Sequence, residues 1–368
     1  MLKNMINILF IGKRFNTNRD ALLEKFGRNY QFPLHLAKNN NVTLWLVDYH
    51  SKQTITTQND TLSITSTPVK NLSLATHYWQ QSRQRPTVDV VIASGDCYIA
   101  FMAYRLAQKL KTKFVFDVYD KYDEFGGYVR PFGFDLFGYL LKKADMRLFA
   151  SHALLRDLGQ DGIDAILSNG IDAEHFRPID QALARQKLQL PADACYVGYF
   201  GSMEPDRGVQ DLIAAVQLLR KQGQNIELLL GGKAAADLDL TQDGIHYLGN
   251  VLFQDVPYAQ AACDVLAIPH RRSPFLDAAA PNKVSEAMIM QRPIVATHAP
   301  NLTANFPELV EQLTPYLASP GNPSSLAQAI KKQMTDRFVM IGSRGFYWND
   351  ITEKIEKHLY RLTSEHPE

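Results

Sequence analysis

"APNKVSEAMIMQRPIVAT", residues 280–297, runs from a helix start straight into a β-branched strand. Pro281 suits the first helical position, because its backbone angle is helix-compatible and its missing N–H would have had no partner there. The amides of Asn282 and Lys283 then face whatever lies ahead of the helix, where the helix dipole favours an anion. Glu286 follows one turn later, and its carboxylate can accept two hydrogen bonds from a vicinal diol such as a ribose. The alternative is a structural role, in which Glu286 complements the dipole and Lys283 is solvated.

A second glycine-rich stretch, "GYFGSMEPDRGVQDLIAAV", covers residues 198–216. Glycines at 198 and 201 allow the backbone to approach a ligand closely. Arg207 precedes Gly208 at the entrance to the next helix, where a guanidinium can grip a diphosphate through paired hydrogen bonds. The alternative is a surface arginine on a turn.

Composition bounds the class of protein. With 368 residues, 46% apolar and 21% charged, the chain can bury a large core and has the length of two domains. Its 39 basic and 38 acidic residues leave a net charge of +1, which argues against a nucleic-acid partner. Three cysteines without metal-type spacing predict reduced thiols and no bound metal. Because no apolar run approaches 18 residues, we expect a cytoplasmic protein.

Short β-branched runs alternate with helical patterns along both halves of the chain. The strands expected in the first half are 6–11, 42–47, 88–94, 113–120 and 146–151. Those expected in the second half are 195–202, 226–232, 245–250, 264–270 and 293–297. Strands and helices of these lengths predict an α/β fold with two doubly wound, Rossmann-like domains. Such sheets bind ligands at the carboxyl ends of their strands.

The connection "NGIDAEHFRPIDQALARQKLQLPADA", residues 169–194, has little strand character and is punctuated by Gly170, Pro178 and Pro191. We therefore place the domain boundary near residue 182. The prediction is a first domain over residues 1–182, a second over 183–345, and a terminal segment over 346–368.

Five segments taken in this order resemble a GT-B glycosyltransferase of the large retaining family 4. They are residues 168–178, 198–215, 226–232, 246–270 and 281–297. The resemblance implies two Rossmann-like domains facing a central cleft, with residues 346–368 returning as a helix to the first domain. It also implies sugar transfer from a UDP- or GDP-sugar to the hydroxyl of a saccharide or lipid-linked acceptor, with retention of configuration. The nucleotide-sugar is then a co-substrate, and no bound cofactor or metal is implied.

By that resemblance Glu286 holds the donor ribose and Arg207 contacts the donor diphosphate. The backbone of Asn250 and Val251 reads the nucleobase. The remaining donor-binding residues that it implies are Gly201, Ser202, Asn282 and Lys283.

Three positions depart from the family pattern. Ala278 stands where the first motif glutamate is expected, with Asp277 as the nearest substitute. Ser202 replaces an expected arginine, so Arg207 has one fewer positive charge beside it for binding the diphosphate. Gln291 replaces a frequent glycine, at a cost of about 1 kcal/mol if its backbone is left-handed.

In the first half, "DVYDKYD", residues 117–123, stands where the resemblance implies a His-Asp pair at the end of a strand. Tyr119 and Asp120 fall at that position, so the resemblance implies that they are the catalytic residues. A carboxylate there can stabilise positive charge at the anomeric carbon or orient the acceptor. The equally weighted alternative is that the acids are solvated and Tyr119 is core. For Arg14 solvation is favoured, and for His270 a structural or solvated role.

The stretch "RPFGFDLFGYLLKK", residues 130–143, has two interpretations. It is either a buried helix with solvated lysines, which we favour, or a face that contacts the inner side of a membrane carrying a lipid-linked acceptor. The function expected from all of these features is a retaining glycosyltransferase in surface polysaccharide or glycolipid synthesis. Two alternatives stay open: a nucleotide-sugar epimerase of the same architecture, and a catalytically degenerate partner subunit.

Overall fold

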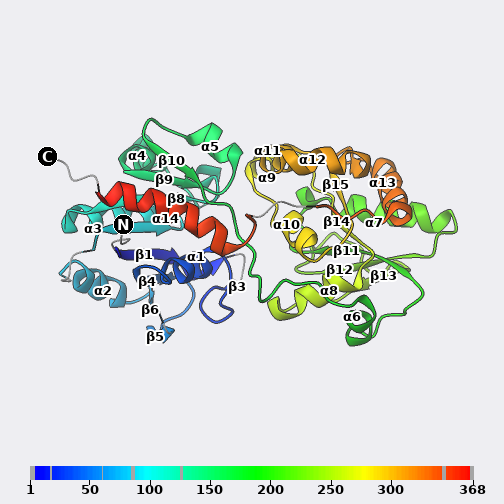
Figure 1. Ribbon diagram of the computed structural model, residues 1–368, viewed down its shortest axis with the longest axis horizontal. Coiled ribbons are helices and arrows are strands. Elements are labelled where there is room, and N and C mark those ends of the chain that lie inside the picture. The colour runs from blue at the N-terminus through cyan, green and yellow to red at the C-terminus, as the bar shows by residue number, and fades with distance from the viewer. Residues whose placement is uncertain are drawn as a thin grey trace. The chain divides into compact units, whose positions relative to one another are not determined.

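The computed structural model describes residues 5–16, 19–59, 61–83, 88–124, 127–341 and 345–364. Its chain divides into two compact units (Figure 1). Unit 1 comprises residues 1–170 together with 345–368, and unit 2 comprises residues 171–344. Each unit is a Rossmann-like α/β domain built on a largely parallel sheet, which confirms the predicted fold class.

Among the described residues of unit 1, an eight-stranded sheet has the order β10-β9-β8-β7-β1-β4-β6-β5. Its bounds are β1 Asn7–Lys13, β4 Asn41–Asp48, β5 Ile55–Asn59, β6 Leu62–Pro68, β7 Val90–Ser94, β8 Lys113–Val118, β9 Met146–Phe149 and β10 Ile163–Ile166. A separate antiparallel pair joins β2 (Phe15–Asn16) to β3 (Arg19–Asp20). Because the chain leaves the central β1 toward one edge and later builds the other, the sheet is doubly wound.

The edge hairpin of β5 and β6 was not predicted. Its strands pair antiparallel, whereas the other pairs of this sheet are parallel. The five residues of β5 are exposed or half-buried and mostly polar, so the strand lacks the apolar signal on which the prediction relied.

The helices of unit 1 cover both faces of this sheet (Figure 1). Their bounds are α1 Arg28–Leu36, α2 Ser73–Gln81, α3 Cys97–Leu110, α4 Leu136–Lys143, α5 His152–Leu158 and α14 Trp348–Ser364, with the short 3-10 turns η1 Tyr122–Glu124 and η2 Pro131–Gly133. The terminal helix α14 packs beside α1 and buries one apolar stripe in the core of unit 1. That stripe consists of Trp348, Ile351, Ile355, Leu359 and Leu362. The spacing of three, four or seven residues keeps these side chains on one face of the helix.

In the described part of unit 2, a six-stranded parallel sheet has the order β13-β12-β11-β14-β15-β16. Its strands are β11 Cys195–Phe200, β12 Ile226–Gly231, β13 Ile245–Tyr247, β14 Val265–Ile268, β15 Ile294–Thr297 and β16 Leu317–Ala318. The helices are α6 Gln181–Lys187, α7 Val209–Lys221, α8 Val256–Ala262, α9 Pro274–Ala278, α10 Asn282–Ile289, α11 Pro300–Asn305, α12 Pro307–Leu313 and α13 Pro323–Asp336. The 3-10 turns are η3 Pro205–Arg207, η4 Phe253–Asp255 and η5 Thr314–Tyr316.

The division between the units falls at residues 170–171 rather than at the predicted residue 182. Residues after Gly170 already pack within unit 2. The ring of His175 stacks on Phe253 with centroids 4.0 Å apart, and the side-chain amide of Gln181 donates to the Cys263 carbonyl at 3.0 Å. The glycine and prolines of residues 169–194 indicated a connecting segment. Only these non-local contacts show that most of this segment belongs to unit 2.

Two sequence interpretations concern surface positions of unit 1. Arg14 is not solvated: it is 4% exposed and forms ion pairs with Asp20 at 2.7 Å and Asp48 at 2.9 Å. Within residues 130–143, helix α4 buries an apolar face through Phe137, as favoured, whereas Phe132 on η2 is exposed. Across the described residues, none of the helices has the length and apolar character needed to cross a membrane.

Candidate functional site

The topological switch point of unit 2 lies between β11 and β14. The chain moves from β11 toward β12 on one side and later returns to β14 on the other, so the loops after these two strands diverge at their carboxyl ends. Open α/β sheets bind ligands in this position. The two loops are tied together, because the Arg271 N–H donates to the Asp206 carbonyl at 2.8 Å. Gly208 is required here: its φ is +70°, and a Cβ atom would lie 1.8 Å from the Pro269 oxygen.

Two helices of unit 2 begin near this edge without a side-chain cap. Helix α7 follows Gly208, and helix α10 follows Pro281. The first turn of α10 contains no acidic residue, and Asp211 in the first turn of α7 is held by Arg271 at 2.6 Å. Uncapped amides combined with the helix dipole favour an anion at both helix starts.

Two cations, Arg207 and Lys283, belong to the same site. Arg207 lies immediately before α7, and its buried Nε has no hydrogen-bond partner among the described residues. Lys283 lies in the first turn of α10 against Gly201, where a Cβ atom would be 2.9 Å from its Nζ. Burial lowers the pKa of Lys283, Glu286 counteracts this, and the charge of Arg207 lowers it further. A bound anion would stabilise both of these cations.

Glu286 is oriented by a neighbour that the sequence analysis did not identify. The Nε2 of Gln260, in α8, donates to Glu286 Oε2 at 2.6 Å. Gln260 is 3% exposed, and its Oε1 is buried without a hydrogen-bond partner in the described part of the chain. The only sequence signal for it was a single amide within an otherwise apolar, Ala-rich segment.

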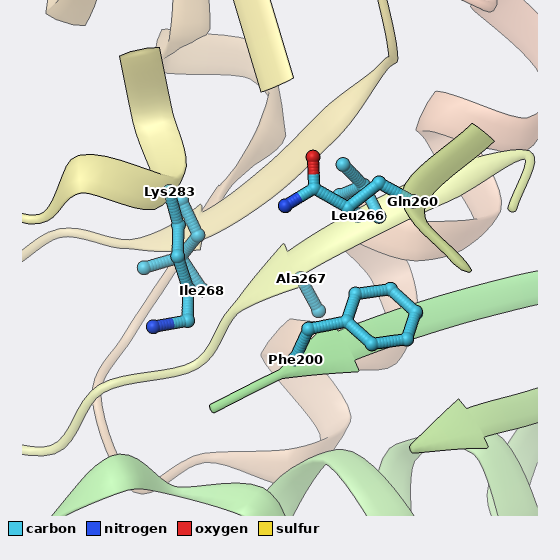
Figure 2. Close-up of a pocket in the computed structure, with 7 residues that line it drawn as sticks. Phe200, Gln260, Leu266, Ala267, Ile268 and Lys283 are labelled. Carbon is cyan, nitrogen blue, oxygen red and sulfur yellow. The ribbon is translucent and has the colours of Figure 1, made fainter. Parts of the chain in front are cut away.

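A small pocket lies among these side chains (Figure 2). Figure 2 shows Lys283 and Gln260 on opposite sides of this group, with the end of the Lys283 side chain level with Phe200 and Ala267. Its lining residues are Gly198, Phe200, Gln260, Leu266, Ala267, Ile268 and Lys283. The pocket therefore joins the ends of β11 and β14 to the start of α10, with an apolar floor and polar groups around it.

His270 follows β14 at the same switch point and is 3% exposed. Its Nδ1 lies 3.2 Å from the side-chain amide nitrogen of Asn301, whereas its buried Nε2 has no partner among the described residues. Burial lowers the pKa of His270 to about 3, and the charges of Lys283 and Arg207 contribute to that shift. The imidazole is therefore neutral at pH 7.

This lowered pKa predicts an acid sensitivity of unit 2. The unfolded imidazole binds a proton near pH 6.5, whereas the folded one stays neutral down to about pH 3. The free energy of unfolding therefore falls as the pH drops below 6.5, by about 2 kcal/mol between pH 7.5 and pH 5. Urea unfolding of the wild type and of His270→Asn at both pH values measures this term. Identical pH dependences of the two proteins would contradict it.

The loop assigned to the nucleobase lies beside the same strand ends. The Gly232 N–H, just after β12, donates to the Gly249 carbonyl at 2.7 Å. This contact places Asn250, which is exposed, and Val251, which is half-buried, next to the carboxyl end of β12. Ser202 follows β11, and its carbonyl accepts a hydrogen bond from the Tyr199 hydroxyl at 2.7 Å.

The structure shows the surroundings of the positions that depart from the family pattern. Ala278 is buried at the end of α9. Both carboxylate oxygens of Asp277 accept from Arg272 Nε, at 3.0 and 2.9 Å, so the nearest substitute for the missing glutamate is already paired. Gln291 has a φ of 53°, which confirms the left-handed backbone at this position.

In unit 1 the acids of "DVYDKYD" differ from one another. Asp117 lies within β8 and is fully buried, and it accepts from Arg28 Nε at 2.7 Å and from the Ser94 hydroxyl at 2.6 Å. The interpretation of Asp117 as a solvated loop acid is therefore wrong. Asp120 is half-buried beyond the end of β8. The pKa of the neighbouring Tyr119 is raised by burial and then by the charge of Asp120.

Comparison with known proteins gives the class of fold. Residues 194–336 match the family model "Glycosyl transferases group 1". The capsular polysaccharide biosynthesis glycosyltransferase CapM of Staphylococcus aureus is 24% identical over 176 residues, which are 46% of this chain and 44% of CapM. The match thus spans less than half the length of this curated relative.

Two solved structures are similar along almost the whole chain. Sucrose-phosphate synthase of Thermosynechococcus elongatus has a TM-score of 0.71 at 17% identity and covers 98% of this chain and 100% of its own. HepE of Anabaena, in complex with UDP and glucose, has a TM-score of 0.69 at 18% identity, with 96% and 99% covered. The fold is that of GT-B glycosyltransferases, with two Rossmann-like α/β domains.

Proposed function

We propose that this protein is a retaining glycosyltransferase that moves a sugar from a UDP- or GDP-sugar to the hydroxyl of a saccharide or lipid-linked acceptor. The observation that carries the proposal is the convergence of Arg207, Lys283 and Glu286 with two uncapped helix starts at the switch point of unit 2. The family match over residues 194–336 supports sugar transfer. The UDP and glucose bound to HepE support a nucleotide-sugar donor. The name of the CapM relative supports a role in surface polysaccharide synthesis.

Each group has a role in this scheme. The amides that begin α7 and α10 bind the diphosphate together with Arg207 and Lys283, and Glu286 accepts from the ribose diol. In the transfer step the bond between the anomeric carbon and the diphosphate oxygen breaks while the acceptor oxygen bonds to the same carbon. The acceptor's proton passes to the leaving diphosphate. Asp120 of unit 1 is assigned to stabilise positive charge at the anomeric carbon or to orient the acceptor.

Thermal unfolding in the presence of UDP, GDP, ADP and their sugars tests the donor assignment, because a ligand that binds the folded state raises its melting temperature. Sugar transfer is then assayed with the stabilising donor and a panel of saccharide and lipid-linked acceptors. A nucleotide-sugar epimerase would convert the donor sugar without acceptor, and a non-catalytic subunit would bind nucleotide without turnover. Neither alternative is supported by the comparisons. Stabilisation by none of the nucleotides would contradict the proposal.

Arg207→Ala is expected to weaken UDP binding about 10- to 100-fold and to leave uridine binding unchanged, because only UDP carries the charge that the guanidinium pairs. The melting temperature without ligand is expected to fall little, since the buried Nε of Arg207 has no hydrogen-bond partner in the described structure and lies 4.0 Å from Asp206 Oδ1. Isothermal titration with both ligands measures the difference, and the exposed Arg177→Ala is the control. An equal loss for UDP and uridine would show that the turn itself was damaged.

A further inference from the structure

His270 occupies a fixed position immediately after β14. Its carbonyl accepts a hydrogen bond from the Thr297 hydroxyl at 2.6 Å, which holds the backbone. On the ring, Nδ1 accepts from the Asn301 side-chain amide at 3.2 Å. A neutral imidazole whose Nδ1 accepts carries its proton on Nε2. The ring therefore presents an N–H donor on the side opposite to Asn301.

That donor is buried and has no partner in the part of the chain that the structure describes. Buried polar side-chain atoms in native proteins are nearly always paired, so an unpaired one requires an explanation. Its surroundings supply one: the charges of Arg207 and Lys283 lie close enough to act on the ring, and Pro269 lies against Gly208, where α7 begins. The unpaired N–H thus belongs to the anion site rather than to the apolar core.

The neutrality of the ring suits this location. A third cation beside Arg207 and Lys283 would add repulsion, whereas an uncharged N–H adds a directed hydrogen bond without further positive charge. Arg207 brings a second donor to the same edge, since its buried Nε has no hydrogen-bond partner among the described residues and its ion-pair partner Asp206 Oδ1 is 4.0 Å away.

We propose that His270 is a ligand-binding residue of unit 2, whose Nε2–H donates a hydrogen bond to a phosphate oxygen of the bound nucleoside diphosphate. This inference rests on the proposed function and assigns to it a group that the sequence motifs do not include.

Two substitutions separate the two ring nitrogens. In His270→Asn, the amide oxygen can still accept from Asn301, but no donor reaches the position of Nε2. In His270→Gln, the longer side chain restores an N–H near that position. We expect about 10-fold weaker binding of UDP and of inorganic pyrophosphate for His270→Asn, recovery to within about 3-fold for His270→Gln, and unchanged uridine binding. The exposed His298→Asn of the same unit is the control.

A spectroscopic measurement on the wild-type protein tests the same contact and needs only one folded variant, for the assignment. In long-range ¹⁵N–¹H spectra at pH 7, the His270 imidazole is expected as the neutral Nε2–H tautomer, with an Nε2 resonance that shifts on saturation with UDP. The resonance is assigned by its loss in either variant.

The results distinguish failure of the His270 assignment from failure of the proposed function. If the wild type binds UDP, GDP or ADP but His270→Asn binds equally well, or if the Nε2 resonance does not move on saturation, the His270 inference is overturned and the proposed function stands. If the wild type binds none of these nucleotides, both are overturned.

Discussion

Glu286→Ala is expected to weaken UDP binding by about 2–4 kcal/mol, or about 30- to 1000-fold, because it removes the carboxylate that we propose accepts charge-assisted hydrogen bonds from the ribose diol. The loss should be much smaller for 2′-deoxy-UDP, which has already lost one of the two hydroxyls. Isothermal titration of wild type and variant with both nucleotides measures the coupling between the carboxylate and the diol.

Two further variants sharpen this test. Gln260→Ala removes the amide that holds Glu286 Oε2, so it should reduce the preference for UDP over 2′-deoxy-UDP by a smaller factor. Glu311→Ala removes an exposed carboxylate of the same unit and should change neither affinity. Equal losses for UDP and 2′-deoxy-UDP in the folded Glu286 variant would remove the ribose role.

Asp120→Asn is expected to leave UDP affinity within about 2-fold of wild type and to lower the rate of sugar transfer at saturating donor about 100-fold. The physical reason is that a charge assigned to the transition state contributes to turnover and not to nucleotide binding. The transfer rate and the dissociation constant for UDP are measured on the same preparation.

Asp161→Asn, at an exposed position of unit 1, is the matched control for this change of charge. Asp117 is unsuitable as a control, because its carboxylate is buried against Arg28. Transfer near the wild-type rate would mean that Asp120 takes no part in the reaction. The acceptor site would then be sought at residues 12–20, of which 17 and 18 lie outside the described residues.

Several features of the fold could be predicted because their signals are local. Residues 195–202 and 226–232 were expected as strands, and the structure has β11 and β12 there. The start of α10 was expected at Pro281 and is found one residue later, at Asn282, with Pro281 as the residue that precedes the helix. Period-two and period-3.6 patterns report burial within one element, so they identify the element without its partners. The exposed strand β5 was missed for the same reason, since it has no buried face to produce a pattern.

Features of the candidate site that depend on distant partners could not be predicted. An arginine next to a strand end is usually solvated, but Arg14 is buried against Asp48, which lies on β4, 34 positions away. Gln260 and Glu286 are separated by 26 positions and meet only because α8 packs beside β11, α10 packs beside β14, and these two strands are neighbours in the sheet. The number of residues between two side chains does not show whether they are in contact unless the strand order of the sheet is known.

By itself the sequence determined that this chain is an α/β protein of two Rossmann-like domains, because strands and helices each have their own periodicity of apolar residues, and the two periodicities alternate along the chain. It also predicted an anion site around Arg207 and a diol site around Glu286 from local helix-start chemistry. The tertiary structure alone decided that Asp117 is held by Arg28, 89 positions away, and that the buried Nε2 of His270 has no hydrogen-bond partner in the described part of the chain. Burial and pairing are set by which strands become neighbours, and strand order is a property of the whole sheet rather than of any one segment.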